Sequence, residues 1–258
     1  MRENPLQNLL KEHTYKESPL SKAEEELRVG QWKKEFIDPW RADAPEPKHF
    51  TDVYTESEII ADIKETARRK ASIQKESHDR ALLTEALIYF LVDKRKLLGR
   101  GVEAFPASHY DDLVNGVDMV LEITRGETPC LLGIDVTVSE DPRVLSEKKG
   151  VINKDLRDEK LTEVKYFQSE PHPKGRVEIP KVVLNITRKE LRNIADMLHS
   201  RRDNDAILRP LQEKLTNQIG TQLTQAEYIL ENLRPLTGRR RMLISIYQKL
   251  RQSISLNS

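Results

Sequence analysis

Two short apolar runs that carry one aspartate each are the feature that most constrains the fold. They lie in GVDMVLEITRGETPCLLGIDVTVS, residues 116–139, and residues 125–129 join them. Short apolar runs separated by Gly, Thr and Pro are typical of two strands joined by a turn. A carboxylate inside a buried strand costs free energy unless a partner compensates its charge. The presence of both Asp118 and Asp135 therefore has to be explained.

The segments around these strands predict an α/β core. Residues 81–92 (ALLTEALIYFLV) are almost all apolar, as in a buried helix, and we expect this helix to continue from one that starts near Thr55 and to end near Gly99. Pro142 then begins a helix whose apolar spacing extends it to about Phe167. A strand over residues 179–186 and a helix capped by Thr187 follow.

The chain divides into three regions on this interpretation. Residues 1–55 form an N-terminal arm, which includes an extended linker over residues 38–47 and either docks through Trp32, Phe36 and Trp40 or is partly disordered. Residues 56–200 form the α/β core with its leading helix. Residues 201–258 are helical, because their apolar residues recur at helical spacing in two runs that Pro235 and Gly238 separate.

Composition limits the class of protein. The net charge is only +1, so any anion-binding surface has to be local. The single cysteine, Cys130, excludes an intramolecular disulfide. The first residues lack the apolar segment of a signal peptide, and the longest apolar run is too short to cross a bilayer. We therefore expect a cytoplasmic protein with no membrane partner.

The two aspartates indicate a cation site. Strand alternation places Asp135 and Thr137 on one face, and Asp118 reaches the same face if the two strands pair. Of two adjacent carboxyl groups, one is driven toward protonation unless a cation neutralises them. Mg²⁺ or Mn²⁺ suits this role, because hard divalent ions bind carboxylate oxygens and can activate water for phosphodiester hydrolysis.

This arrangement resembles the PD-(D/E)XK nuclease superfamily. The resemblance covers residues 80–190 and rests on Glu85 in the first core helix, Asp118 in GVDMVLE and Asp135 in GIDVT. It implies a restriction-endonuclease-like α-β-β-β-α-β core with a mixed sheet, and Mg²⁺-dependent cleavage of DNA. It also implies that Asp118, Asp135 and the main-chain carbonyl of Val136 hold the metal, assisted by Glu85.

The motif lysine is displaced in this sequence. Thr137 stands where the superfamily carries it, and some members place it on the following helix instead. The strand runs about five residues beyond Asp135, roughly 17 Å at ~3.3 Å per residue. A returning helix covers that length in about eleven residues at ~1.5 Å each. This spacing indicates Lys149, which lies in an apolar stripe, and then Lys148 as the catalytic lysine.

An alternative uses the literal Glu-x-Lys at residues 163–165. If residues 161–168 formed a strand, Asp135 would be the first acid, and Glu163 and Lys165 would complete the site. The helical spacing of apolar residues favours a helix there, from whose end Lys165 could still reach DNA. Among the remaining acids, Glu122 is a weaker ligand candidate. Asp111 and Asp112 are interpreted mainly as loop or capping residues, and either is a substitute acid if the strand register is shifted.

The most basic local segment is Arg239-Arg240-Arg241, which we interpret as a nucleic-acid contact. Arginines at a helix N-terminus oppose its dipole, so a bound anion would help to explain them. The helical extensions would grip DNA or a second protomer in a homodimer. The alternative function is a catalytically inactive nuclease fold that binds nucleic acid or protein, which Thr137 favours.

Overall fold

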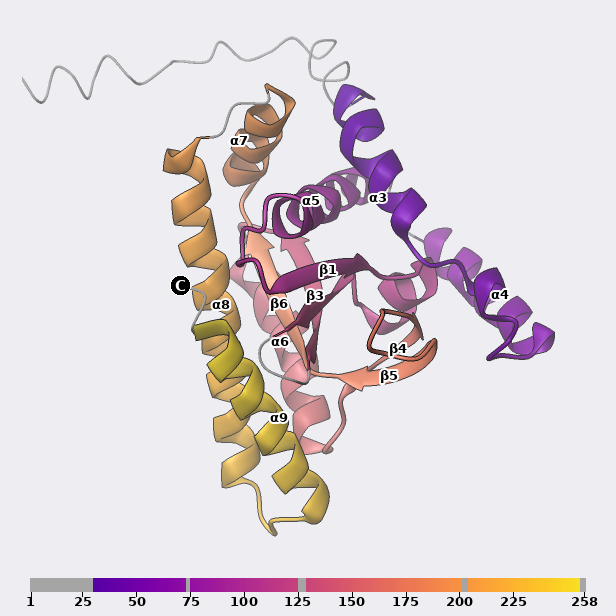
Figure 1. Cartoon of the computed structure of the whole chain (residues 1–258), viewed down its shortest axis with the longest axis vertical. Coiled ribbons are helices and arrows are strands. Elements are labelled where there is room, and N and C mark those ends of the chain that lie inside the picture. Colours follow the sequence, from indigo (N-terminus) through magenta and orange to yellow (C-terminus); the bar gives the residue numbers. More distant parts are fainter. Residues whose placement is uncertain (1–29, 73–74, 125–128, 201–203, 256–258) are drawn as a thin grey trace, which may run out of the picture.

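A four-stranded mixed sheet forms the centre of the computed structural model, which describes residues 30–72, 75–124, 129–200 and 204–255 (Figure 1). Its strand order is β1 (Val102–Pro106), β2 (Met119–Ile123), β3 (Cys130–Val138) and β6 (Lys181–Ile186). The first three strands pair antiparallel, and β6 pairs parallel to β3. The strands β4 (Thr162–Phe167) and β5 (Gly175–Ile179) form a separate antiparallel pair between α6 and β6.

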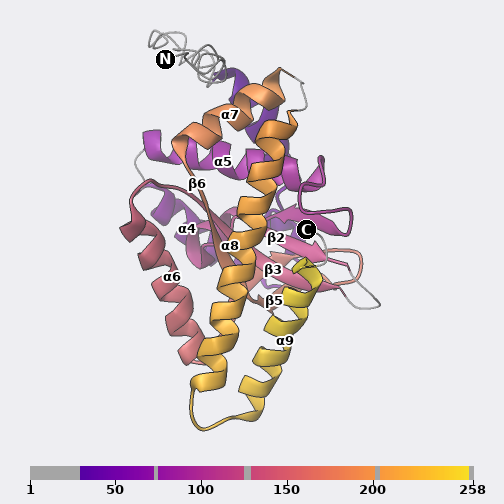
Figure 2. The ribbon, with the colours of Figure 1, turned by 90° about the vertical axis from the view of Figure 1, so that its left-hand side faces the viewer.

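Helices surround the sheet on several sides. They are α3 (Asp38–Asp43), α4 (Glu56–Lys70), α5 (Lys75–Asp93), α6 (Pro142–Arg157), α7 (Arg188–His199), α8 (Asp205–Asn232) and α9 (Gly238–Ser255). Helix α5 packs against β1 and β3, and α6 packs against β6 and α8. The order α5-β1-β2-β3-α6-β6 makes the chain an α/β protein. Figure 2 shows the long α8 running past the sheet, with α9 folded back beside it.

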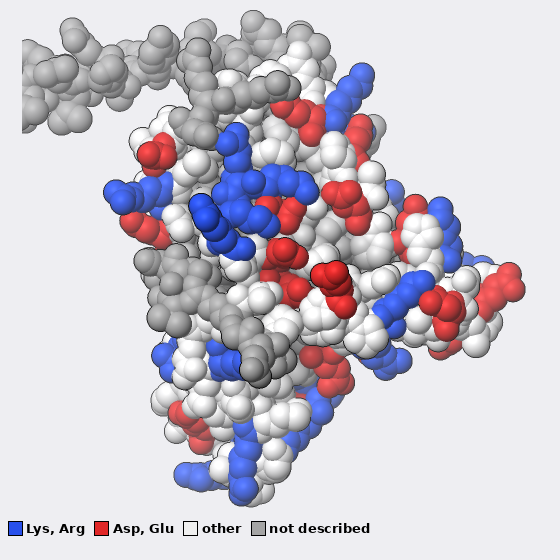
Figure 3. Space-filling view, viewed as in Figure 1, with Lys and Arg blue, Asp and Glu red and all other residues white. Residues whose placement is uncertain are grey.

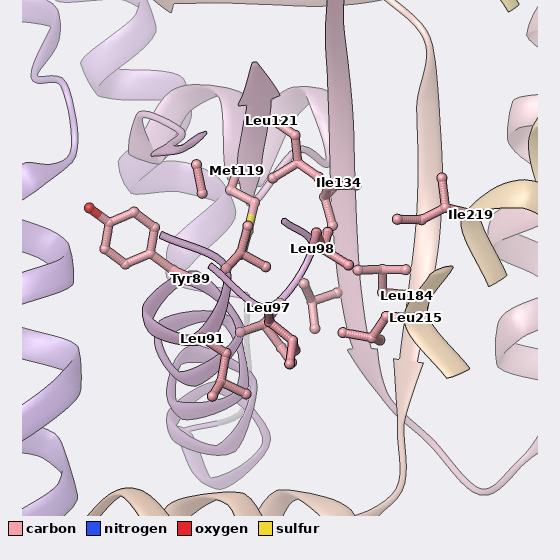
Figure 4. Packing of buried hydrophobic residues seen from close by; sticks show 14 of the residues in the cluster. Tyr89, Leu91, Leu97, Leu98, Met119, Leu121, Ile134, Leu184, Leu215 and Ile219 are labelled. Carbon is pink, nitrogen blue, oxygen red and sulfur yellow. The ribbon is translucent and has the colours of Figure 1, made fainter. Parts of the chain in front are cut away.

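The main core lies between the sheet and helix α5. Met119, Leu121 and Ile134 face Leu91 and neighbouring side chains of α5, and Leu215 and Ile219 of α8 close the core from the β6 side (Figure 4). Helix α5 is apolar on nearly all sides, which is typical of a helix enclosed by protein. An acidic residue on such a helix, Glu85, is therefore costly to bury.

Two glutamines of α8 cover the outer edge of β6. The side-chain amide of Gln222 accepts from the N–H of Val183 at 2.9 Å and donates to its carbonyl at 2.8 Å. Gln218, one helical turn earlier, does the same with Asn185 at 2.7 and 3.1 Å. The amides thus satisfy main-chain groups that an edge strand would otherwise leave unpaired.

The N-terminal arm packs against the core, because Trp32, Phe36 and Trp40 are buried in it. The prediction of an extended linker over residues 38–47 is wrong, because this segment begins with helix α3 and ends at the 3₁₀ turn Pro47–Phe50. Residues 1–29 of this arm lie outside the described residues, as does most of the predicted turn over residues 125–129.

Three further differences separate the observed elements from those predicted. The single helix expected from Thr55 to Gly99 is two helices, α4 and α5. The helix expected to reach Phe167 ends at Arg157, and residues 162–167 form strand β4. The five residues of strand β1 carry no sequence pattern strong enough to predict a strand there. Within the described residues, none of the helices has the length and apolar character needed to span a membrane.

Candidate functional site

Strand β2 begins at Met119, which pairs with Ile134 of β3, so Asp118 lies one residue before β2 and not within a strand as predicted, while Asp135 lies within β3. The N–H of Asp118 donates to the carbonyl of Ile134 at 2.8 Å, and its carboxylate Oδ2 accepts from the N–H of Val136 at 2.5 Å. Both carboxyl groups are buried, with 6% and 8% of these residues exposed.

The Val136 carbonyl points toward the same place. In an extended strand the N–H and C=O of one residue point to the same side. The N–H of Val136 is bonded to Asp118, so its carbonyl is directed to the side from which Asp118 approaches. The carboxylate of Asp118 therefore lies against the main chain of β3 at Val136, just before the start of β2.

Glu85 of α5 joins this cluster from inside the core. It is 5% exposed, and its Oε2 is buried without a hydrogen-bond partner. Burial raises the pKa of Glu85 well above its usual range, and the charges of Asp112 and Asp135 raise it further. Burial likewise raises the pKa of Asp118, and Glu85 and Asp135 add to that effect.

Asp112 is the fourth acid, and the sequence interpretation had treated it mainly as a loop or capping residue. It lies in the short π-helix Asp111–Asn115, which ends at Gly116 with φ of +63°. The left-handed conformation of Gly116 turns the chain toward β2, and the side chain of Asp112 forms a hydrogen bond with Asp118. Burial and the charge of Asp135 raise the pKa of Asp112 to about 6, although Arg41 and a hydrogen bond with Asp118 oppose this shift.

The lysine beside the carboxylates is Lys148 of α6. Its Nζ lies 2.5 Å from Oδ1 of Asp135. Burial acts to lower the pKa of Lys148, but the carboxylate of Asp135 outweighs it, so the pKa is raised and the side chain stays cationic. The preferred candidate, Lys149, lies instead beside Ile152 and Gln222 where α6 meets α8. Of the two lysines that the spacing indicated, the second is the one that contacts the site.

A second lysine that the sequence interpretation did not single out lies nearby. Lys181 at the start of β6 donates from Nζ to the carbonyl of Asn115 at 3.0 Å. Burial lowers its pKa, and the charges of Asp135 and Asp118 act against that shift. Only the parallel pairing of β6 with β3 brings this side chain to the cluster, so no local pattern could have indicated it.

The cluster also receives a guanidinium from the N-terminal arm. Arg41 of α3 lowers the pKa of both Glu85 and Asp112 through its charge. Its Nε and Nη2 are buried and have no hydrogen-bond partner. The site thus combines four acids with cationic side chains from α3, α6 and β6.

The donor set suits a hard divalent cation. Its oxygens are carboxylates and one main-chain carbonyl, the groups that Mg²⁺ prefers. The unpartnered Oε2 of Glu85 is an oxygen available for such an ion. As it stands, however, the described part of the chain has no group of three or more His, Cys, Asp or Glu residues that could hold a metal. The ammonium of Lys148 and the N–H of Val136 bind the carboxylates instead.

The alternative half-site at Glu163 and Lys165 lies away from these acids. Residues 161–168 do contain a strand, β4, but Lys165 is buried against Asp62, with Nζ 2.5 Å from Oδ2. Glu163 pairs with Arg176. Lys165 therefore does not extend to bind DNA from a helix end as the sequence interpretation expected. Glu122 is also engaged elsewhere, with Ser169 and His172.

The arginines of α9 are largely used inside the molecule. Arg240 is 5% exposed, and its Nη2 lies 2.5 Å from Oε1 of Glu159. Arg239 pairs with Glu178 at 2.9 Å. Glu178 and Glu159 therefore neutralise the two arginines at the start of α9, and no bound anion is needed to explain them. Arg241 is exposed.

Positive and negative side chains are mixed on the face shown in Figure 3. Lys and Arg form one compact group above its centre, with Asp and Glu beside and below them. No protein family, curated protein or solved structure matches this chain.

Proposed function

We propose that this protein is an Mg²⁺-dependent nuclease that hydrolyses phosphodiester bonds in DNA. The observation that carries the proposal is that Asp118, whose carboxylate accepts from the N–H of Val136, lies at β3 next to Asp135, to which the cationic Lys148 is bound. The strand and helix order α5-β1-β2-β3-α6-β6, with β6 parallel to β3, supports a restriction-endonuclease-like core.

The residues have separate roles on this proposal. Asp118, Asp135 and the Val136 carbonyl would hold the metal, with Glu85 assisting through its free oxygen. When bound, Mg²⁺ supplies acidification of water and stabilisation of charge on the phosphate. Lys148 keeps its proton because its pKa is raised, so it stabilises negative charge on the phosphate and does not act as a base.

Cleavage assays test this proposal. The purified full chain with Mg²⁺ or Mn²⁺ should cut plasmid or branched DNA, and Asp135→Asn should abolish cutting. Lys148→Met should slow cutting by about 10²-fold or more, the usual effect of removing one stabilising group at a transition state. Lys149→Met is the matched control and should cut like the unaltered chain. Equal activity of Asp135→Asn would remove the proposal.

A binding module of the same fold is the second candidate. The ion pair of Lys148 with Asp135 favours it, because an ammonium already neutralises one carboxylate. Calorimetric titration with Mn²⁺ separates the candidates. A nuclease should bind Mn²⁺ and lose this binding in Asp118→Asn, whereas a binding module should show no Asp118-dependent heat.

A further inference from the structure

Asp111 is a buried acid that the proposed mechanism does not use. It lies at the start of the π-helix that precedes β2 and is 0% exposed, the lowest value among the buried acids of the described residues. Its Oδ1 accepts from Nδ2 of Asn115 at 2.9 Å and from the main-chain N–H of Lys165 at 2.7 Å. Its Oδ2 accepts from Oγ of Ser108 at 2.7 Å and from the N–H of Tyr166 at 3.0 Å.

These four hydrogen bonds occupy both oxygens of Asp111. A carboxylate has about four lone-pair sites, so neither oxygen is left for a cation. The group has to be ionised, because a protonated carboxyl group would turn one acceptor into a donor that faces other donors. Asp111 is therefore not the substitute acid that a shifted strand register would need.

The same hydrogen bonds join two segments that are distant in the sequence. The two main-chain donors belong to β4, and the two side-chain donors belong to the segment between β1 and β2. Asp111 and Lys165 are 54 residues apart. The end of the π-helix is held separately by β6, because Nζ of Lys181 donates to the carbonyl of Asn115 at 3.0 Å. The segment before β2 is thus fixed to β4 and to β6.

This segment in turn holds the main chain of Asp118. The N–H of Ala107, the residue before Ser108, donates to the carbonyl of Asp118 at 3.0 Å. The N–H of Val117 donates to the main-chain carbonyl of Asp111 itself at 3.1 Å. The residue that precedes Asp118 and the residue that binds its carbonyl are therefore both connected to Asp111.

We propose that Asp111 is a positioning residue for the metal site: its carboxylate holds residues 107–117 on β4, and this segment sets the carboxylate of Asp118 against the N–H of Val136. The use of this placement to bind a divalent ion rests on the proposed function, and the placement itself does not. Hydrogen bonds to a buried carboxylate are strong, because its surroundings have a low dielectric constant. A ligand that is fixed in advance loses less conformational freedom when the ion binds.

Hydrogen exchange in the metal-free full chain, followed by NMR, tests the positioning. The N–H of Val136 donates to the carboxylate of Asp118, so its exchange rate reports whether that carboxylate stays in place. The N–H of Gly133, in the same strand, donates to the carbonyl of Pro180 at 2.8 Å. Exchange at Gly133 is therefore the internal reference.

Two variants weaken the network to different degrees. Asp111→Asn replaces one accepting oxygen with a donating amide. Ser108→Ala removes only one donor to Asp111, and it keeps the test available if the first variant does not fold. In both, exchange at Val136 should become about tenfold faster or more relative to Gly133. Unchanged relative exchange in every variant that folds would refute the positioning role.

Asp62→Asn is the matched control, because it acts on the same two residues of β4. Oδ2 of Asp62 accepts from Nζ of Lys165 and from the hydroxyl of Tyr166, each at 2.5 Å, and not from their main-chain N–H groups. This variant should lower the melting temperature and leave the relative exchange at Val136 unchanged. If it speeds that exchange as much as Ser108→Ala does, loosening of β4 alone explains the effect, and the specific role of Asp111 is overturned.

Calorimetric titration with Mn²⁺ separates this inference from the nuclease proposal. If both are correct, Ser108→Ala weakens Mn²⁺ binding by about tenfold or more, the usual effect of changing a residue that orients a metal ligand, and Asp62→Asn does not. Faster exchange at Val136 in a chain that binds no Mn²⁺ would leave the positioning role in place and remove the nuclease proposal. If Asp118→Asn abolishes Mn²⁺ binding, but Ser108→Ala and Asp111→Asn leave it unchanged, the nuclease proposal stands and the role of Asp111 at the metal site is refuted.

Discussion

At the scale of a single residue, the pKa of the Asp112 carboxyl group depends on the groups that surround it in the site. Its pKa is about 6 in the folded chain, against an ordinary value of 3.8. A folded-state pKa above the unfolded value means that the folded protein binds the proton more tightly. The resulting contribution to stability is present at low pH and is lost as the pH rises from about 4 to 6.

We therefore expect the metal-free protein to be more stable at pH 5 than at pH 7.5. Asp112→Asn should reduce this difference by about 1 kcal/mol, because the amide does not titrate. Urea unfolding at pH 5 and at pH 7.5 in EDTA measures this difference in stability for both proteins. A pH dependence that Asp112→Asn leaves unchanged would contradict the assigned environment.

Metal binding would reverse the sign of this pH dependence of stability. A divalent ion binds the ionised carboxylates, so it competes with protons and stabilises the folded chain more at high pH. The acids of this cluster are thus poised between protonation and cation binding. This behaviour follows from four acids sharing one buried place, and no one residue would show it alone.

At the scale of elements, α8 replaces a missing strand. Gln218 and Gln222 are four residues apart, so both side chains lie on one face of the helix and meet alternate residues of β6. This arrangement covers the outer edge of β6, whose other edge pairs with β3, the strand that carries Asp135. Strand β6 is therefore held from both sides.

Replacing both Gln218 and Gln222 with Ala should destabilise the protein by about 2 kcal/mol, since each hydrogen bond contributes roughly 0.5–1.5 kcal/mol net. Gln225→Ala, at an exposed position of the same helix, is the control and should have little effect. Chemical denaturation measures both. Equal stability of the double variant and the control would show that the amides do not hold the edge.

At the scale of the whole molecule, the helical hairpin α8–α9 is attached to the core through Glu159. This residue lies just after α6 and pairs with the buried Arg240, while its carbonyl accepts from Nε of Arg239 at 2.8 Å. Thr237 also donates to its carboxylate at 2.6 Å. The C-terminal helices are thus integrated into the fold at the point where the chain turns from α6 toward β4.

Arg240→Ala should destabilise the protein clearly more than Arg241→Ala, because it removes a side chain that is only 5% exposed together with its hydrogen bonds to Pro235 and Glu159. Arg241→Ala should change stability by less than about 0.5 kcal/mol, as is usual for an exposed residue. Both values come from urea unfolding at pH 7.5. If the Arg241 variant were the less stable of the two, the structural role assigned to Arg240 would be wrong.

Local patterns in the sequence were sufficient to predict part of this structure. The alternation of apolar residues located β3 with Asp135 and most of β2, although Asp118 lies just before β2, and capping residues located the starts of α6 and α7. The paired C-terminal helices also followed from apolar spacing. Periodicity and capping act over a few residues, so a single sequence contains them.

Contacts between distant segments decided the rest. Residues 162–167 have a helix-like spacing of apolar residues, but pairing with β5 makes them a strand. The preference for Lys149 over Lys148 was wrong, because adjacent helix residues point about 100° apart and the rotation of α6 is set by its packing on β6 and α8.

The sequence by itself determined that an α/β core would carry two acids at adjacent strands. Asp135 lies within β3 and Asp118 just before β2. Only the tertiary structure decided which groups surround them: Glu85 from α5, Asp112 from the turn before β2, Lys148 from α6 and Arg41 from the N-terminal arm. The physical reason is that hydrogen bonding and side-chain periodicity are local, whereas burial and electrostatic interaction depend on which segments meet in space.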